Sequence, residues 1–237
     1  MSKILADAVV VVAGAGGGAG GAVVRQLAAA GATAVMADTS VDRLGPLAEE
    51  VAASGGRAVG HAVDLLDEDA TKSWADSVVA EFGRVDGVVH LVGGWRGGKG
   101  IVESDLADWA LLSDLLIRTV QHTTRAFHDA LLAAPAGRFA LISAAAASRP
   151  TADNASYAAA KAAAEAWTLA VADSFRGSSA AATVLVVKAL LTPAMREAKP
   201  EGKFTGFTDV ADLAQEIVSL WEKPAAEVNG ARLWLTN

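Results

Sequence analysis

The chain has 237 residues, which favours a single domain, and it has no cysteine and no metal-like histidine spacing, which leaves no visible metal ligands. Its net charge of −7 without a basic cluster disfavours nucleic-acid binding, and no apolar run is long enough for a membrane span. Because Asp7 would interrupt a secretory signal, we expect a cytoplasmic, single-domain protein (residues 1–237) that binds a small molecule.

Apolar runs typical of strands alternate with helical patterns along the whole chain. Strands are expected at 8–13, 32–38, 57–64, 85–92, 137–143, 181–188 and 231–236, and helices at 22–31, 41–54, 67–83, 106–134, 155–175 and 209–222. Because parallel strands need crossover connections, this alternation predicts an α/β fold, a doubly wound parallel sheet of about seven strands with helices on both faces. Ligands of such sheets bind beyond the carboxyl ends of the strands.

A glycine-rich turn follows the first expected strand and opens the first expected helix. Its residues fit two patterns, Gly14-x-Gly16-x-x-Ala19 and Gly14-x-x-x-Gly18-x-Gly20, and the sequence alone allows both. In either pattern the backbone can approach a pyrophosphate, whose charge the helix N-terminus favours. We therefore interpret the turn as a dinucleotide site, with a ligand-free turn as the alternative. The candidate contacts are Gly14, Gly17, Gly18, Ala19 and Gly20.

Two aspartates end the next two expected strands. Asp38 lies where a carboxylate can accept hydrogen bonds from both hydroxyls of an adenosine ribose and would repel a 2′-phosphate. It predicts NAD as the cofactor, with NADH preferred over NADPH, although Arg43 is close in sequence. Asp64, with Leu65 beside it, is placed to meet an adenine ring, but it could equally be the N-cap of the helix expected at 67.

Tyr157 and Lys161 are four residues apart, and therefore one turn apart on one face of an expected helix. A neighbouring ammonium stabilises a phenolate, so we expect Lys161 to lower the pKa of Tyr157 and prepare it for proton donation near neutral pH. Lys161 could also hold a nicotinamide ribose. Both residues are candidates for catalysis and for cofactor binding.

Together, Gly14-x-x-x-Gly18-x-Gly20, Asp64 and Tyr157-x-x-x-Lys161 resemble the short-chain dehydrogenase/reductase family over essentially the whole chain. The resemblance implies a Rossmann-type fold and an NAD(P)-dependent oxidoreductase. It also implies further cofactor contacts at Val92, Gly93, Leu190 and Thr192.

Two of the chain's departures from this family concern the usual catalytic serine and the usual helix asparagine. The usual catalytic serine falls on Ala144, with Ser143 one position too early, and the usual helix asparagine falls on Leu116. Since that serine helps to polarise a substrate carbonyl, its loss would lower the rate with an ordinary ketone by about 10²–10³.

In these departures the chain is similar to the dihydropteridine reductase branch of the family. The similarity lies in Gly93-Gly94-Trp95 with glycines at 97 and 98, in the alanine that replaces the serine, and in Thr192-Pro193 followed by Met195. A quinonoid dihydropteridine is electron-poor and accepts hydride with less help than a ketone. Trp95 would then offer a ring for stacking, or it packs under its own glycines. Ser143 is the second candidate substrate contact.

Three functions remain open. The first is hydride transfer from NADH to a quinonoid dihydropteridine-like or other electron-poor substrate, with Tyr157 as proton donor. The second is an alcohol or ketone dehydrogenase that uses Ser143 in place of the missing serine, and the third is a non-catalytic NAD-binding protein. The apolar surfaces of the helices at 106–134 and 155–175 predict a homodimer or homotetramer. Residues 196–207 fit a mobile flap or an ordinary loop.

Overall fold

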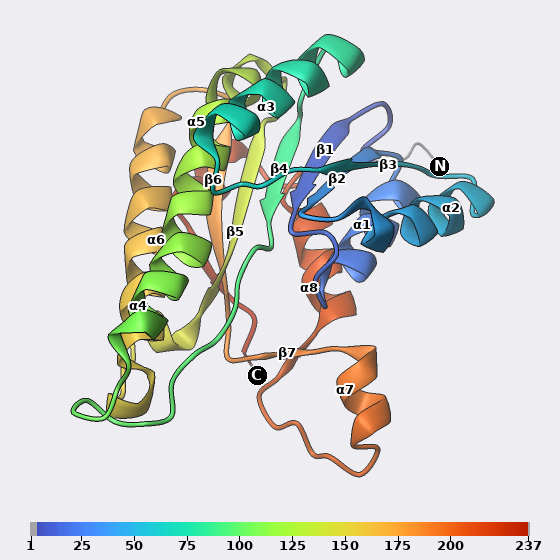
Figure 1. The fold of residues 1–237 in the computed structure, drawn as a ribbon. Coiled ribbons are helices and arrows are strands. Elements are labelled where there is room, and N and C mark those ends of the chain that lie inside the picture. The colour runs from blue at the N-terminus through green and yellow to red at the C-terminus, as the bar shows by residue number, and fades with distance from the viewer. Residues whose placement is uncertain (1–3, 237) are drawn as a thin grey trace.

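A seven-stranded parallel sheet forms the centre of the computed structural model, which describes residues 4–236 (Figure 1). Its strands are β1 (Val9–Ala13), β2 (Thr33–Asp38), β3 (Arg57–Ala62), β4 (Gly87–His90), β5 (Arg138–Ala144), β6 (Ala181–Val187) and β9 (Arg232–Trp234). Their order across the sheet is β3-β2-β1-β4-β5-β6-β9. The direction of winding reverses between β1 and β4, so the segments that follow these two strands lie side by side. The predicted doubly wound α/β fold is confirmed.

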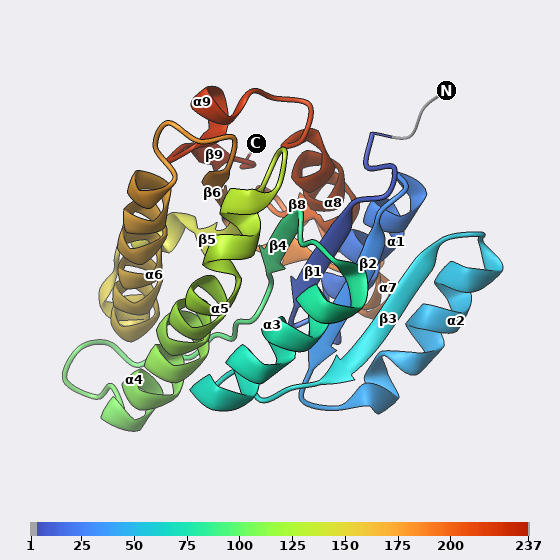
Figure 2. The same ribbon diagram turned by 90° about the horizontal axis from the view of Figure 1, so that it is seen from above.

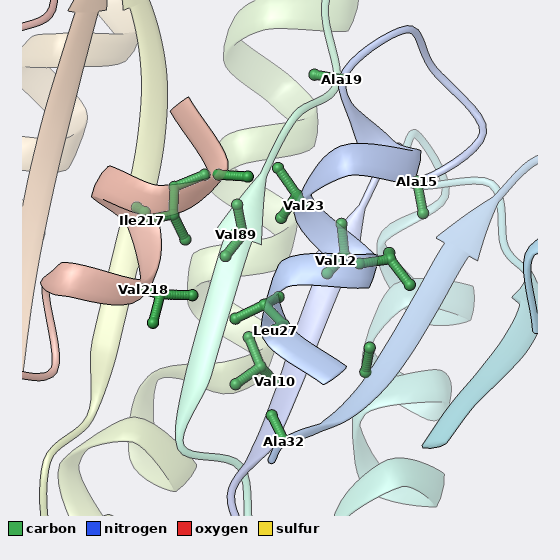
Figure 3. Close-up of a cluster of buried hydrophobic side chains, with 14 of the residues drawn as sticks. Val10, Val12, Ala15, Ala19, Val23, Leu27, Ala32, Val89, Ile217 and Val218 are labelled. Atoms are coloured by element: carbon green, nitrogen blue, oxygen red, sulfur yellow. The ribbon is translucent and has the colours of Figure 1, made fainter. Parts of the chain in front are cut away.

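Helices cover both faces of the sheet (Figures 1 and 2). One face carries α1 (Gly20–Ala29), α2 (Gly45–Ala53) and α8 (Val210–Ser219), and the other carries α3 (Glu68–Phe82), α5 (Thr119–Ala133) and α6 (Ala155–Ser174). Figure 3 shows the core of the first face, where Val12 of β1, Leu27 of α1 and Ile217 of α8 lie in one cluster. Successive valines of β1 enter opposite cores because side chains alternate along a strand.

The helix expected at 106–134 is not continuous. α4 (Leu106–Ser113) passes into a π-helical segment, Asp114–Arg118, before α5 begins. There the amide of Thr119 donates to the carbonyl of Asp114, while the Thr119 hydroxyl donates to the carbonyl of Leu115 at 2.7 Å. The side chain thus takes the carbonyl that the amide would use in an α-helix. A helical spacing of apolar residues does not reveal a local bond of this kind.

The chain between β6 and α8 forms structure that the sequence did not predict. β7 (Leu190–Leu191) and β8 (Thr208–Asp209) pair as a small second sheet, and α7 (Pro193–Ala198) lies between them in sequence and projects at the carboxyl edge of the main sheet (Figure 1). The expected loop at 196–207 therefore begins inside a helix. The remaining elements are α9 (Ala225–Val228) and three short 3-10 turns at Val41–Arg43, Ala145–Ala147 and Ala152–Asn154. Within residues 4–236, no helix has the length and apolar character to cross a membrane.

Candidate active site

A pocket of about 290 Å³ opens at the carboxyl ends of the first four strands. Seven of the predicted cofactor contacts line it: Gly14, Gly17, Asp38, Asp64, Leu65, Val92 and Gly93. Further lining residues that were not among the predicted contacts are Thr39, Arg43, Val63, Leu66, Leu91, Leu115 and Thr119. The structure therefore brings residues from four separate loops into one site, and in residues 4–236 no cluster of three potential metal ligands accompanies them.

The glycine turn lies tightly against its neighbours. Gly14 has a φ of +80°, and a Cβ there would lie 2.8 Å from the amide nitrogen of Val92. A Cβ on Gly20 would collide with the carbonyl oxygen of Ala15, and one on Gly18 would lie 3.0 Å from the methyl group of Thr192. A Cβ on Gly16 would lie 2.7 Å from Asp38 Oδ2, so the close approaches of the turn fit both glycine patterns.

The turn also leaves backbone donors free. The amides of Gly18 and Ala19, just before α1 begins at Gly20, donate no hydrogen bond within the part of the chain that the structure describes. Unpaired amides at the start of a helix are the groups that bind a phosphate. Free amides beside positions that tolerate no Cβ fit the pyrophosphate of a dinucleotide.

Asp38 lies at the wall of the pocket with its side chain 11% exposed. Its carboxylate accepts hydrogen bonds from the amides of Gly16 at 3.1 Å and Thr39 at 2.9 Å, and Arg43 lies 3.5 Å away. The aspartate is thereby held at the end of β2, close to the glycine turn. The Arg43 guanidinium, on a side chain that is 63% exposed, lies within ion-pair distance of the carboxylate.

Asp64 caps its own turn and not the following helix. Its Oδ1 accepts a hydrogen bond from the amide of Leu66 at 2.9 Å, whereas the N-cap of α3 is Asp67, which accepts from the amide of Ala70 at 2.9 Å. The alternative interpretation of Asp64 as the N-cap of the following helix is therefore wrong. The side chain of Asp64 lines the pocket beside Leu65, as its interpretation as an adenine contact requires.

Tyr157 and Lys161 occupy successive turns at the start of α6. The Lys161 Nζ donates a hydrogen bond to the carbonyl of Ile142 at 2.8 Å and lies 6.0 Å from the centre of the Tyr157 ring. Tyr157 packs against a small cluster that contains Leu116, and a Cβ on Gly93 would lie 3.5 Å from the same leucine. Leu116 thus connects the tyrosine to the pocket.

The acid–base properties of this pair differ from the expectation. Burial raises the pKa of Tyr157, whereas Lys161 was expected to lower it. Burial also lowers the pKa of Lys161 to about 8, against a smaller opposing effect of Glu165. The physical reason is that the ammonium is directed to the carbonyl of Ile142, so the loss of water around the phenol dominates.

The two candidate substrate contacts do not line this pocket. Ser143 is 1% exposed, and its hydroxyl donates to Glu165 Oε1 at 2.5 Å. Trp95 is 56% exposed in the loop after β4, and a Cβ on Gly97 would lie 3.3 Å from its ring, so it packs over its own glycines.

The two contacts expected after β6 lie at the glycine turn and beside the core. The Thr192 hydroxyl accepts a hydrogen bond from the amide of Met195 and so caps α7, while its methyl group faces Gly18. Leu190, in β7, packs against the core that contains α1 and α8. α7 is thereby tied close to the predicted phosphate site.

Two buried residues beside the site were not among the predicted contacts. His90, at the end of β4, is 1% exposed and bonds Thr119 Oγ1 through Nε2 at 3.1 Å, and burial lowers its pKa to about 3. Glu165 is 2% exposed. Glu165 follows Lys161 by four residues, as Lys161 follows Tyr157. This spacing was the sequence signal that could have identified Glu165.

The tight contact at Gly20 leads to a stability prediction. Gly20→Ala should lower the free energy of unfolding by about 1–3 kcal/mol, because its Cβ has no room beside the Ala15 carbonyl. Gly45→Ala is the matched control, since a Cβ there meets nothing within 4 Å and should leave stability unchanged or raise it by about 0.5 kcal/mol. Urea unfolding followed by circular dichroism measures both; equal losses would contradict the close packing of the turn.

Known proteins are similar to this chain in sequence and in fold. The family model described as short chain dehydrogenase matches residues 8–202. A curated short chain dehydrogenase of Pseudocercospora fijiensis is 32% identical over 142 residues, which is 60% of this chain and 46% of that protein. The match therefore spans less than half the length of this relative.

Solved structures match almost the whole chain. A short-chain type dehydrogenase/reductase from Mycobacterium ulcerans superposes with a TM-score of 0.88 at 24% identity, covering 98% of this chain and 89% of that one. A short chain dehydrogenase from Shigella flexneri, complexed with NADP, gives 0.88 at 21% identity and 99% of both chains. A xylitol dehydrogenase with bound NAD+ gives 0.85 at 19% identity and 98% of both chains.

Proposed function

The chain belongs to the short-chain dehydrogenase/reductase family, and we propose that it is an oxidoreductase that reduces an electron-poor substrate of the quinonoid dihydropteridine type with NADH. When bound, the dinucleotide supplies the hydride. The glycine turn would hold its pyrophosphate, Asp38 its adenosine ribose, and Asp64 with Leu65 its adenine. The free amides and the absence of room for side chains in the turn support this placement.

Tyr157 is the proposed proton donor. Because burial raises its pKa, the phenol keeps its proton at neutral pH and has it available for a substrate atom that gains electron density. Lys161, with a pKa of about 8, is mainly an ammonium at pH 7 and is fixed by the Ile142 carbonyl one turn along the helix. A protonated phenol suits the reductive direction, in which the enzyme gives up a proton.

The observation that carries the choice of substrate is the position of the Ser143 hydroxyl. It is buried and donates to Glu165, and the neighbouring Ala144 has no hydroxyl to offer. A ketone carbonyl would therefore find the tyrosine but no serine donor beside it. An electron-poor ring needs less polarisation, so the missing donor limits such a substrate least.

The two other functions have weaker support. An alcohol or ketone dehydrogenase would need the Ser143 side chain to leave Glu165 and reach the substrate, which would leave a buried carboxyl oxygen without its donor. A non-catalytic NAD-binding protein would need no tyrosine one turn from a buried lysine. The bond between Ser143 and Glu165 favours an electron-poor substrate, and the tyrosine–lysine pair favours catalysis over cofactor binding alone.

The first test removes only the phenol oxygen. Tyr157→Phe should lower kcat by about 10²–10⁴ with NADH and a quinonoid dihydropterin, because the proton donor is lost, while the affinity for NADH stays nearly unchanged. Steady-state kinetics and a fluorescence titration of NADH measure the two quantities. Because water can supply the proton to a quinonoid substrate, the variant can retain some turnover of it. Ketones and quinones are therefore assayed in parallel. Full activity of the variant on every substrate would refute the mechanism.

The second test separates the two enzymatic alternatives. Ser143→Ala should lower kcat by less than about tenfold, because a buried hydroxyl that bonds Glu165 cannot donate to the substrate. The same kinetic assay measures it beside Tyr157→Phe. A loss as large as that of the tyrosine variant would instead support the alcohol or ketone dehydrogenase.

Cofactor preference is tested at Asp38. We propose that NADH binds more tightly than NADPH, and that Asp38→Ser changes the ratio of the two dissociation constants by about tenfold or more in favour of NADPH, equivalent to about 1.4 kcal/mol. The variant removes the repulsive carboxylate and leaves Arg43 free to meet a 2′-phosphate. Asp42→Ser, at an exposed neighbouring position, is the control and should keep the original ratio. Tighter binding of NADPH by the unaltered protein would exclude the proposed preference.

We also propose a homodimer or homotetramer. α4 presents apolar side chains to solvent, with Leu106 77% exposed and both Trp109 and Leu111 39% exposed, and an assembly would cover part of this apolar surface. Light scattering at micromolar concentration should give twice or four times the monomer mass. A monomer under these conditions would count against the proposal.

A further inference from the structure

Two buried charged residues, Lys161 and Glu165, follow Tyr157 along α6. Tyr157, Lys161 and Glu165 follow one another at intervals of four residues and therefore lie on successive turns of one helix face. Lys161 is 7% exposed and Glu165 only 2% exposed. Charged groups are rarely buried to this extent unless hydrogen bonds or opposite charges compensate them, so we expect both residues to have such partners.

Strand β5 anchors both charged residues. The carbonyl of Ile142 accepts the hydrogen bond from Lys161 Nζ at 2.8 Å, and the hydroxyl of the next residue, Ser143, donates to Glu165 Oε1 at 2.5 Å. Two consecutive strand residues thus bond two consecutive turns of the helix. This arrangement fixes the position of α6 along β5 and, with it, the positions of the lysine and the tyrosine.

The other carboxyl oxygen of Glu165 has a partner from the edge strand of the sheet. Arg232 of β9 forms an ion pair with Oε2, and its side chain is 43% exposed. Glu165 therefore contacts a half-exposed cation from the last strand, and the buried Lys161 lies one turn away on its own helix. Both carboxyl oxygens are bonded, as a buried carboxylate requires.

We propose that Glu165 is a positioning residue that keeps Lys161 in its ammonium form beside Tyr157, and that Ser143 and Arg232 hold Glu165 in place for this task. The proposal rests on the catalytic roles proposed above for the tyrosine and the lysine. Glu165 acts through Lys161, since it is buried and lines no part of the pocket at the glycine turn.

The charges around Lys161 agree with this role. Burial lowers its pKa to about 8, and Glu165 acts in the opposite direction. Among the described residues, the other titratable groups near the ammonium are Tyr157 on the same helix and His90 on β4, which burial keeps neutral. Arg232 contacts the outer side of Glu165. Glu165 is thus the group whose negative charge favours the ammonium.

The test measures the titration of Lys161 directly. In protein labelled with 13C-lysine, the Cε resonance that disappears in Lys161→Met reports on this side chain, with no cofactor or substrate present. Glu165→Gln keeps the shape of the side chain and an acceptor for Ser143 but removes the charge, so the titration midpoint should move down by about one to two pH units. An unchanged midpoint would overturn the proposal.

Arg232→Gln is the matched variant and should act in the opposite direction. Removing this cation makes the electrostatic potential at Lys161 more negative, which favours the ammonium. The titration midpoint of Lys161 should therefore move up by about half a pH unit or more. A merely structural role would loosen the helix in both variants and move both midpoints the same way, which would count against the proposal. If Glu165→Gln does not fold, the half-exposed Arg232 still provides the test, and the absence of an upward shift refutes it.

A second readout connects the titration with the reaction. The alkaline limb of the pH profile for NADH oxidation should move in each variant by the amount and in the direction seen by NMR. Opposite shifts by NMR without matching shifts in the profile would overturn the link between Glu165 and the reaction. A protein inactive on every substrate would refute the proposed function, while the NMR titration would still decide whether Glu165 controls the charge of Lys161.

Discussion

Parallel strands that pair side by side cannot be joined by a tight turn, so the chain must return to the starting edge of the sheet through a crossover after each strand. In this protein the crossovers are mostly helices, and they change face at the point of reversal: α1 and α2 cover one face, α3, α5 and α6 the other, and α8 returns to the first. Every strand of the main sheet consequently ends at the same edge. Gly14, Asp38, Asp64 and Gly93, which are far apart in the sequence, meet there because each follows a different strand.

The site that results has two halves with different physical requirements. The half at β1 to β3 depends on the backbone: a turn with no room for side chains, free amides and a carboxylate fixed by neighbouring amides. The half at β5 and α6 depends on buried charge, because Lys161 and Glu165 are held away from water by bonds to the strand. The first half tolerates few substitutions for steric reasons. The second is sensitive to any change in the balance of charge.

Much of this arrangement could be predicted from the sequence, because the glycine turn, Asp38 and the Tyr157–Lys161 pair each carry a local pattern of residue type and spacing. The position of the Ser143 side chain could not, because a change of one residue along a strand moves a side chain to the opposite face of the sheet. The raised pKa of Tyr157 depends on burial by Leu116 and its neighbours, which are distant in sequence. β7 and β8 were missed because two-residue strands have no periodicity to detect.

The π-helical segment Asp114–Arg118 has a consequence for comparing this chain with other proteins. A π turn holds one residue more than an α-helical turn, so the segment takes up one extra residue while the helices on either side keep the faces that they present. Leu116 lies in this segment and reaches Tyr157 from it. In a continuous α-helix, by contrast, one extra residue would rotate everything beyond it by about 100°. Relatives whose helix is continuous therefore align with this chain only through a one-residue gap between α4 and α5, and counting positions across the segment without that gap pairs the wrong side chains.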